Sequence, residues 1–308
     1  MCIRDSSCSV PSVRPIEMLK IKEGPPGYRL ARKLEGYGFE ICLLASALIA
    51  FLPFYWAITI SIRNPIETFT VTGLAVPFVQ FQPTLISWIE ELSVGEAQRA
   101  LINSSVIALG TAVGLFVLGT PAAYALARFR FRRPNNQNLT IWFLSQRVLP
   151  PIVTVVPVFM MMRQLHLLDT RLALVIVNIT FNLPLVVTIM RQGFLDIPIE
   201  LEEAALVDGA NHARVFWHIS MRLALPCLMA SMLISIAYTW NEFLFALTIS
   251  SRESITVPVH MAGAAGTRGI QFWFVGVRVL IAMAPPVILA LLAQRFIVRG
   301  LTVGALKG

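Results

Sequence analysis

Six apolar stretches, each long enough to cross a lipid bilayer as a helix, dominate this chain of 308 residues. A hydrocarbon core of about 30 Å needs roughly 20 apolar residues in helical form. The stretches lie at residues 41–62, 101–126, 139–162, 172–190, 223–250 and 270–296. Helices satisfy their backbone hydrogen bonds within the segment, which lipid requires. The sequence therefore predicts an all-α membrane protein with six transmembrane helices.

The composition agrees with this fold class. Hydrophobic residues make up 56% of the chain and charged residues only 14%, which is too apolar for a soluble domain of this length. Several prolines, among them Pro150, Pro151 and Pro226, fall in or at the ends of the spans. Neighbouring helices can satisfy the backbone groups that proline leaves unpaired, so we expect kinked helices in a bundle.

Basic residues are distributed unevenly between the two sides of the membrane. With an inside N-terminus, 17 Lys and Arg residues fall in inside segments and six in outside loops. The positive-inside rule then places both termini in the cytoplasm. The same asymmetry accounts for the net charge of +8 and suits contact with anionic lipid, without a nucleic-acid partner.

These spans divide the chain into three predicted regions. We expect a cytoplasmic N-terminal tail at residues 1–36, a six-span domain at 37–298 and a cytoplasmic tail at 299–308. Roughly the first dozen residues contain no apolar stretch, so they are not a cleavable signal peptide; we expect them to be disordered or a non-native leader. The first span then acts as an uncleaved signal anchor.

Enzyme and metal-site patterns are absent from the sequence. Its cysteines are scattered, no His-Glu-x-x-His pattern occurs, and no nucleophile and base are placed together at membrane depth. No Gly-x-x-x-x-Gly-Lys-Ser/Thr loop is present, so the chain itself does not bind ATP in the P-loop manner. We expect no catalytic residue, metal or cofactor.

A polar segment at residues 196–220 interrupts the apolar pattern between the fourth and fifth spans. Three glutamates, Glu200, Glu202 and Glu203, fall in one turn, where the helix dipole favours negative charge. Gly209 allows a bend before a second amphipathic turn. Such a segment can lie on the membrane surface or enter a groove on a partner. Anionic headgroups repel the glutamates, which favours the docking role.

Part of this segment resembles the EAA loop of ABC importer permeases, through Glu203, Ala204, Ala205, Gly209 and Ile219. Other blocks, in the family's order, are similar to the maltose-type carbohydrate permeases. They lie at residues 103–105, 119–131, 149–151, 168–170, 240–243 and 299–308. The chain departs from the family at Met221-Arg222, where Leu-Pro is usual at the break between the coupling helix and span five.

The resemblance implies a type I ABC importer permease fold with a cytoplasmic coupling helix, in a bacterial inner membrane. Implied partners are a second homologous permease subunit, two ATP-binding subunits and an extracytoplasmic solute-binding protein. The implied ATPase-coupling residues are Glu203, Ala204, Ala205, Asp208, Gly209 and Phe216. The implied C-terminal tail residues, which reach between the ATPase subunits, are Gly300, Gly304 and Lys307.

The implied substrate is a sugar, sugar alcohol or related polyol. Alternatives are another small solute such as a glycerol phosphate, or a self-contained secondary transporter. The latter would need its own coupling-ion site and usually more spans with an internal repeat.

Arg147, Glu242 and Arg278 lie inside the predicted spans, where charge is costly, although Arg278 can lie near an interface. Three alternatives stay open for Arg147 and Glu242: a buried structural pair, pairing with the other subunit, or contact with substrate. Polar groups in span four also face the predicted bundle interior. The pathway candidates are Asn178, Phe181, Asn182, Arg147, Asn241 and Glu242. The long outer loop at residues 63–100 is either a connector or a partial contact for a substrate-delivery protein.

Overall fold

A computed structural model describes residues 26–71, 73–93, 95–263, 265–266 and 269–305. The chain divides into two units, Met1–Pro53 and Phe54–Gly308. Most of the predicted N-terminal tail and Lys307 lie outside the described residues. Helix α1 (Pro26–Ser61) begins in the first unit, and the tail's residues 26–36 are its first turns. Its segment Phe39–Ser61 is long and apolar enough to span a membrane, which confirms the first predicted span.

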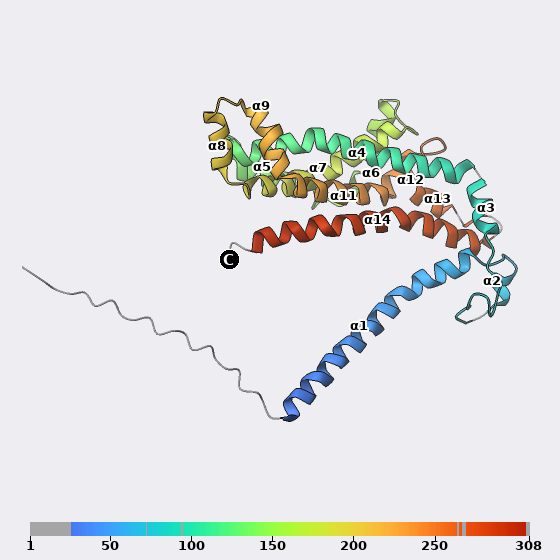
Figure 1. The fold of residues 1–308 in the computed structure, drawn as a ribbon. Coiled ribbons are helices and arrows are strands. Elements are labelled where there is room, and N and C mark those ends of the chain that lie inside the picture. The colour runs from blue at the N-terminus through green and yellow to red at the C-terminus, as the bar shows by residue number, and fades with distance from the viewer. Residues whose placement is uncertain (1–25, 72, 94, 264, 267–268, 306–308) are drawn as a thin grey trace, which may run out of the picture. The chain divides into compact units, whose positions relative to one another are not determined.

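The second unit is almost entirely helical (Figure 1). In chain order, its first helices are α2 (Glu67–Thr70), α3 (Ile86–Ser93), α4 (Gly95–Arg128), α5 (Asn136–Ser145), α6 (Pro151–Gln164) and α7 (Arg171–Leu195). There follow α8 (Ile199–Val207), α9 (His212–Val215), the π-helix η1 (Phe216–Ser220), α10 (Met221–Leu223), α11 (Leu225–Trp240), α12 (Leu244–Ile249), α13 (Val257–Ala262) and α14 (Phe272–Ala305). A short antiparallel pair, β1 (Ala265–Gly266) and β2 (Gly269–Ile270), precedes α14.

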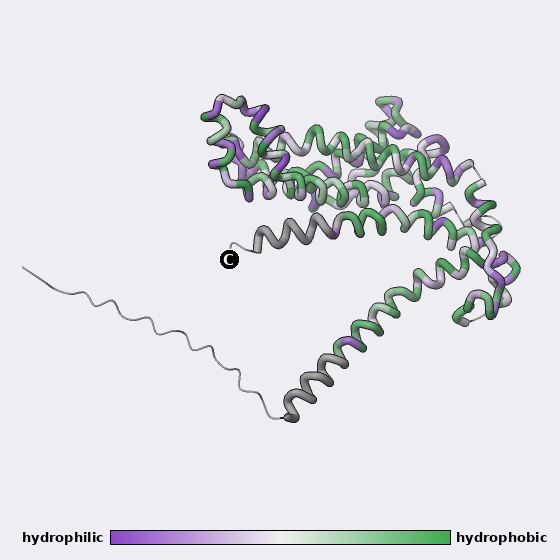
Figure 2. Tube along the Cα trace, viewed as in Figure 1, coloured by the Kyte–Doolittle hydropathy of each residue, from purple (hydrophilic) through white to green (hydrophobic). Residues whose placement is uncertain are grey.

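Helices α4, α7, α11 and α14 run side by side as a bundle (Figure 1). Helices α8 and α9 lie at one end of this bundle, and α3 and α13 lie at the other. Figure 2 shows apolar residues along the long helices and a concentration of polar residues around α8 and α9. The polar segment predicted from the sequence therefore lies at one end of an apolar bundle.

Three further predicted spans are confirmed as single helices of sufficient length and hydropathy: α4, α7 and the Phe272–Leu292 part of α14. The predicted span at 139–162 is wrong as a continuous helix, because α5 ends at Ser145 and α6 begins at Pro151. Proline lacks an amide hydrogen and disfavours helical geometry in the residue before it, so Pro150-Pro151 interrupts the helix. Neither α5, with 10 residues, nor α6, with 14, is long enough to span a membrane by itself.

The predicted span at 223–250 is also interrupted. Helix α11 ends at Trp240, and α12 begins at Leu244 after a break at residues 241–243. At its other end, α11 follows the segment His212–Leu223 with a bend of 75°. Pro226, in the first turn of α11, is compatible with a helix start but not with continuation from α10. The bend therefore forms although the family's Leu-Pro is absent at Met221-Arg222.

Close packing of α4 against α7 forms much of the core. A Cβ atom added to Gly114 would overlap the side chain of Ile179, so glycine lets the two helix backbones approach. Phe194 and Met190 of α7 and Leu115 of α4 are completely buried in the same apolar cluster. This cluster extends to Phe216, which connects the bundle core to the segment after α8.

Candidate functional site

A cavity of about 650 Å³ opens among α7, the α11–α12 break and the α5–α6 break. Its wall includes all six pathway candidates, Asn178, Phe181, Asn182, Arg147, Asn241 and Glu242. The three segments lie far apart in the sequence. Because both helix interruptions face the same space, they place polar backbone and side chains there rather than towards lipid.

Helix α7 contributes a polar face to the cavity. Asn178 and Asn182 are four residues apart and therefore lie on one side of the helix. Both side chains are buried, and the Asn182 amide donates to the Thr239 hydroxyl of α11 at 3.3 Å. The Asn178 amide donates to the Leu174 carbonyl of its own helix at 2.9 Å. These contacts hold two amides at the cavity wall.

Glu242 caps α12. Its two carboxylate oxygens accept hydrogen bonds from the Phe245 and Ala246 amides at 2.8 and 3.0 Å. These amides belong to the first turn of the helix, where no intrahelical acceptor exists and where the helix dipole favours an anion. The carboxylate thus stabilises the short helix that follows the break.

Arg147 lies in the α5–α6 break, with its guanidinium 5.7 Å from the centre of the Tyr238 ring. Among the residues that the structure describes, neither Arg147 nor Glu242 forms an ion pair. The structure therefore does not contain the structural pair between them. Pairing with another subunit and contact with substrate stay predictions.

Aromatic cavity residues that the sequence reasoning missed are Tyr238, Phe243 and Phe245. The ring of Phe245 lies 4.8 Å from that of Phe181, centre to centre. The signal in the sequence was their position beside Asn241-Glu242, since a helix interruption exposes several consecutive side chains to one space. The cavity therefore combines amides, aromatic faces, one guanidinium and the Glu242 carboxylate.

The coupling residues predicted from the sequence divide between surface and core. Glu203, Ala204, Asp208 and Gly209 are exposed, and Ala205 is half-buried. Val207, on the same side of α8 as Glu203, is 87% exposed. Together Glu203, Ala204, Val207 and Asp208 form what we term the α8 surface.

Phe216 does not belong to the α8 surface. It is buried, and its ring lies 4.9 Å from that of Tyr124 of α4, centre to centre. A buried ring cannot contact a separate protein directly. Phe216 instead fastens the segment after α8 to the bundle.

The sequence reasoning missed the residue that anchors this segment, Glu202. Its carboxylate is buried and accepts from Arg128 Nε at 2.9 Å, Tyr124 Oη at 3.0 Å and Ser220 Oγ at 2.9 Å. Arg128 also donates to the Ile197 carbonyl at 3.0 Å. One buried ion pair thus ties α8 and η1 to the end of α4.

Gly209 produces the turn between α8 and α9. Its φ of +88° lies in the left-handed region that glycine adopts readily. The Asn211 side chain then accepts from the Arg214 amide at 2.8 Å and caps α9. The predicted bend at Gly209 is confirmed. At the C-terminus, Gly300 and Gly304 lie within α14 rather than in a separate tail.

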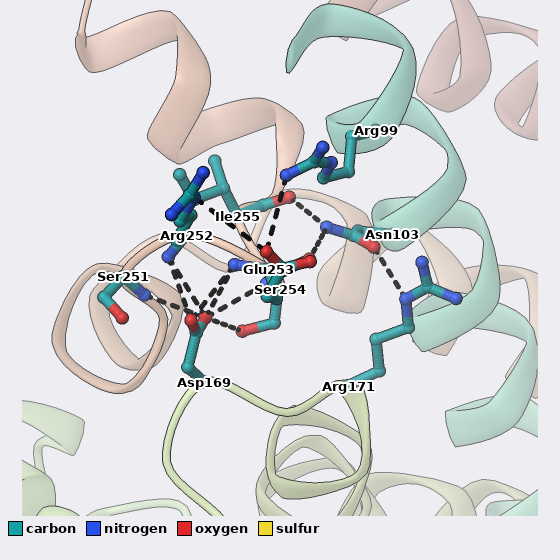
Figure 3. A network of polar contacts seen from close by, with 9 residues as sticks. All are labelled: Arg99, Asn103, Asp169, Arg171, Ser251, Arg252, Glu253, Ser254 and Ile255. Atoms are coloured by element: carbon teal, nitrogen blue, oxygen red, sulfur yellow. Dashed lines mark hydrogen bonds and ion pairs between the residues drawn. The ribbon is translucent and has the colours of Figure 1, made fainter. Parts of the chain in front are cut away.

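A polar network at the opposite end joins the turn before α7 to the loop after α12 (Figure 3). The Asp169 carboxylate accepts from the amides of residues 251–254 at 3.0–3.2 Å and from the Ser254 hydroxyl. These bonds hold the pKa of Asp169 well below its usual range, although burial opposes the shift. Asn103 of α4 donates to the carbonyls of residues 253 and 255. The network fixes the ends of α4, α7 and α12 that lie away from α8.

Residues 117–303 match the family described as "Binding-protein-dependent transport system inner membrane component". The chain belongs to this family. It is therefore a multi-pass permease subunit of the inner membrane, not an enzyme, and works with a binding protein and a separate ATPase.

Two relatives and one solved structure illustrate the similarity. The chain is 34% identical to the probable ABC transporter permease protein y4oR of Sinorhizobium fredii, over 86% of this chain and 93% of the relative. It is 33% identical to the trehalose/maltose transport system permease protein MalG of Thermococcus litoralis, over 85% and 93%. A bacterial ABC transporter involved in the import of the acidic polysaccharide alginate shares the fold, with a TM-score of 0.72 and 22% identity, over 86% of this chain and 97% of that one.

Proposed function

We propose that this permease imports a sugar, sugar alcohol or related polyol, and that its cavity forms part of the translocation pathway. The composition of the cavity wall supports the proposal. Sugar hydroxyl groups both donate and accept hydrogen bonds, and sugar rings stack on aromatic faces. Asn178, Asn182 and Asn241 supply amides, and Phe181 and Tyr238 supply rings. A relative that is named for trehalose and maltose transport favours the same substrate class.

The proposal includes a homologous second permease, which completes the pathway, and two ATP-binding subunits. One of these ATP-binding subunits docks on the α8 surface of this chain. The α8 surface faces away from the bundle, while Glu202 and Phe216 fasten its base to α4 and the core. Motion of a docked ATPase would therefore pass to α4 as well as to α11. An excess of basic residues around this end supports a cytoplasmic location for it and for both termini.

A reconstituted system tests the proposal. The permease, its partner permease, the ATP-binding subunits and the binding protein encoded nearby are placed in proteoliposomes, and uptake of labelled sugars and polyols is measured with and without ATP. ATP-dependent uptake is expected. Uptake that follows an ion gradient and ignores ATP would instead support a secondary transporter.

Cavity variants separate the pathway from the rest of the machine. Asn182→Leu is expected to reduce sugar uptake at least tenfold, because it removes an amide from the cavity wall. Gln164→Leu, an exposed amide at the end of α6 outside the cavity, is the matched control and is expected to keep normal uptake. Normal uptake by Asn182→Leu would show that the cavity does not carry the substrate.

One observation favours a second candidate substrate, a glycerol phosphate. Arg147 lines the cavity and has no ion-pair partner among the described residues, so its guanidinium is available for an anion. Two results together would establish this alternative. The unaltered transporter would take up glycerol phosphate and no neutral sugar, and Arg147→Gln would abolish the uptake of glycerol phosphate.

A further inference from the structure

An exposed apolar segment follows α1 on the side of the bundle opposite the α8 surface. We term residues 66–71 and 73–81 the outer apolar segment. Five large apolar side chains in it are at least two-thirds exposed: Ile66, Phe69, Leu74, Phe78 and Val79. A concentration of this kind on a loop marks a contact with another apolar phase or molecule.

Glu67 is the one charged residue of the outer apolar segment. The sequence contains no Asp, Glu, Lys or Arg between Glu67 and Glu90. A surface loop that contacts water or a polar protein face normally carries charges. Contact with lipid explains their absence, because charged groups are costly to place among acyl chains.

The backbone of the segment satisfies many of its own hydrogen bonds. The Phe78 amide donates to the Phe81 carbonyl at 2.9 Å, and the Gln80 amide to the Val76 carbonyl at 3.0 Å. The Gln80 side chain accepts from the Val76 amide at 2.8 Å. Ala75 and Phe78 have φ values of 51° and 63°, which non-glycine residues adopt only when the surrounding structure holds them there. The turn is therefore closed on itself, with Phe78 and Val79 exposed and Ala75 and Phe81 buried. Internal pairing of this kind suits non-helical backbone near lipid.

Contacts with two spans set the depth of the segment. The Tyr55 hydroxyl contacts the Ala75 carbonyl at 3.4 Å, and Tyr55 lies six residues, or about 9 Å along the helix axis, before the end of α1. The Phe69 ring lies 6.1 Å from that of Trp273, in the first turn of α14. Arg63, buried two residues after the end of α1, donates to the Val71 carbonyl at 3.4 Å and lies over the Phe81 ring. The turn thus folds back towards the ends of the spans.

We propose that the outer apolar segment rests in the outer leaflet of the membrane, at the boundary between headgroups and acyl chains. Interfacial elements bury their apolar face about 5–10 Å deep, which agrees with the depth of the Tyr55 contact. Phe69 and Trp273 lie where aromatic residues gather in membrane proteins. The segment would hold the ends of α1 and α14 that it contacts at a constant depth in the membrane.

Spin labelling of the whole transporter in lipid nanodiscs tests this proposal. A cysteine replaces Val79 in a transport-competent variant without the four natural cysteines, and a nitroxide is attached. The control is Arg252→Cys, at an exposed position in the charged loop at the same end of the bundle. The relaxation of the spin label is measured in the presence of oxygen, which concentrates in lipid, and separately in the presence of a water-soluble nickel chelate.

Oxygen is expected to relax the label at position 79 more than the nickel chelate does, and the order is expected to reverse at position 252. Equal behaviour at the two positions would place Val79 in water and overturn the proposal. Weak relaxation by both reagents at position 79 would show that protein covers the segment, whether the second permease, the binding protein or the first unit of this chain. That outcome also overturns it, while leaving the proposed transport function intact.

Discussion

Replacement of Glu202 by alanine is expected to loosen the polar segment at residues 196–220 from α4. Glu202 is 5% exposed, and its carboxylate accepts hydrogen bonds from Arg128, Tyr124 and Ser220. Without it, the Arg128 guanidinium stays buried and keeps the Ile197 carbonyl as its partner among the described residues. Loss of one member of a buried ion pair costs about 3–5 kcal/mol. Since Arg128 keeps one acceptor, we expect a loss of about 3 kcal/mol.

The neighbouring glutamate is a matched control. Glu203 is exposed and should change the free energy of unfolding by less than about 0.5 kcal/mol when replaced by alanine. Unfolding of the purified permease in mixed micelles, titrated with a denaturing detergent, measures both variants. Glu203→Lys is expected to insert normally yet weaken ATPase association, as co-purification of the assembled transporter would show. Normal association and transport by Glu203→Lys would contradict the docking role of the α8 surface.

A double-mutant cycle isolates the ion pair. Arg128→Met removes the buried charge that Glu202→Ala would leave unpaired, so the double variant should be more stable than the sum of the single changes predicts, by at least about 1 kcal/mol. A loss below 1 kcal/mol for Glu202→Ala, or strictly additive costs, would refute the assignment of Glu202 as an anchor.

Three other changes test the fold. Asp169→Asn is expected to cost about 2 kcal/mol, because a neutral amide replaces an anion held by several amide donors. The pKa of Asp169 is lower in the folded state, so its contribution to the free energy of unfolding is complete above the unfolded pKa of about 4 and declines as the pH falls below it. The Asn variant should lack this loss of stability in acid. Gly209→Ala should cost about 1–2 kcal/mol through its left-handed φ, without a steric clash, and a thermal shift below the error of measurement would contradict this. Gly114→Ala should destabilise the permease by about 1–3 kcal/mol through overlap with Ile179, whereas Gly95→Ala, with open space around it, should not.

The sequence predicted continuous helices where hydropathy was high over about 20 residues, and α4, α7 and α14 agree. It failed at the two interrupted spans because hydropathy does not register a local loss of helical hydrogen bonding. Pro150-Pro151 was visible as a signal for one break. The break at 241–243 has no proline, and there the Glu242 carboxylate replaces the missing intrahelical acceptors.

The pathway candidates were selected as polar groups in apolar spans, and the structure places them around one cavity. Tyr238 and Phe245 were missed because aromatic residues are ordinary in a membrane helix, and their position beside Asn241-Glu242 became informative only once the structure showed a helix break there. Glu202 and Glu203 are chemically identical and adjacent, so no pattern in the sequence distinguished the buried anchor from the exposed residue. Their difference arises from the position of Arg128, 74 residues away in the chain.

By itself the sequence determined that the chain is a helical membrane protein, which side of the membrane its basic residues favour, and where its polar segment at residues 196–220 begins and turns. These properties depend on local composition and spacing, namely the length of apolar runs, the sign of loop charges and the backbone freedom of Gly209. The tertiary structure decided which helices are interrupted, which polar residues share the cavity and which glutamate is buried. Those outcomes depend on contacts between residues far apart in the chain. Whether a polar group is buried, and which partner it meets there, sets its free energy, and local composition does not specify either.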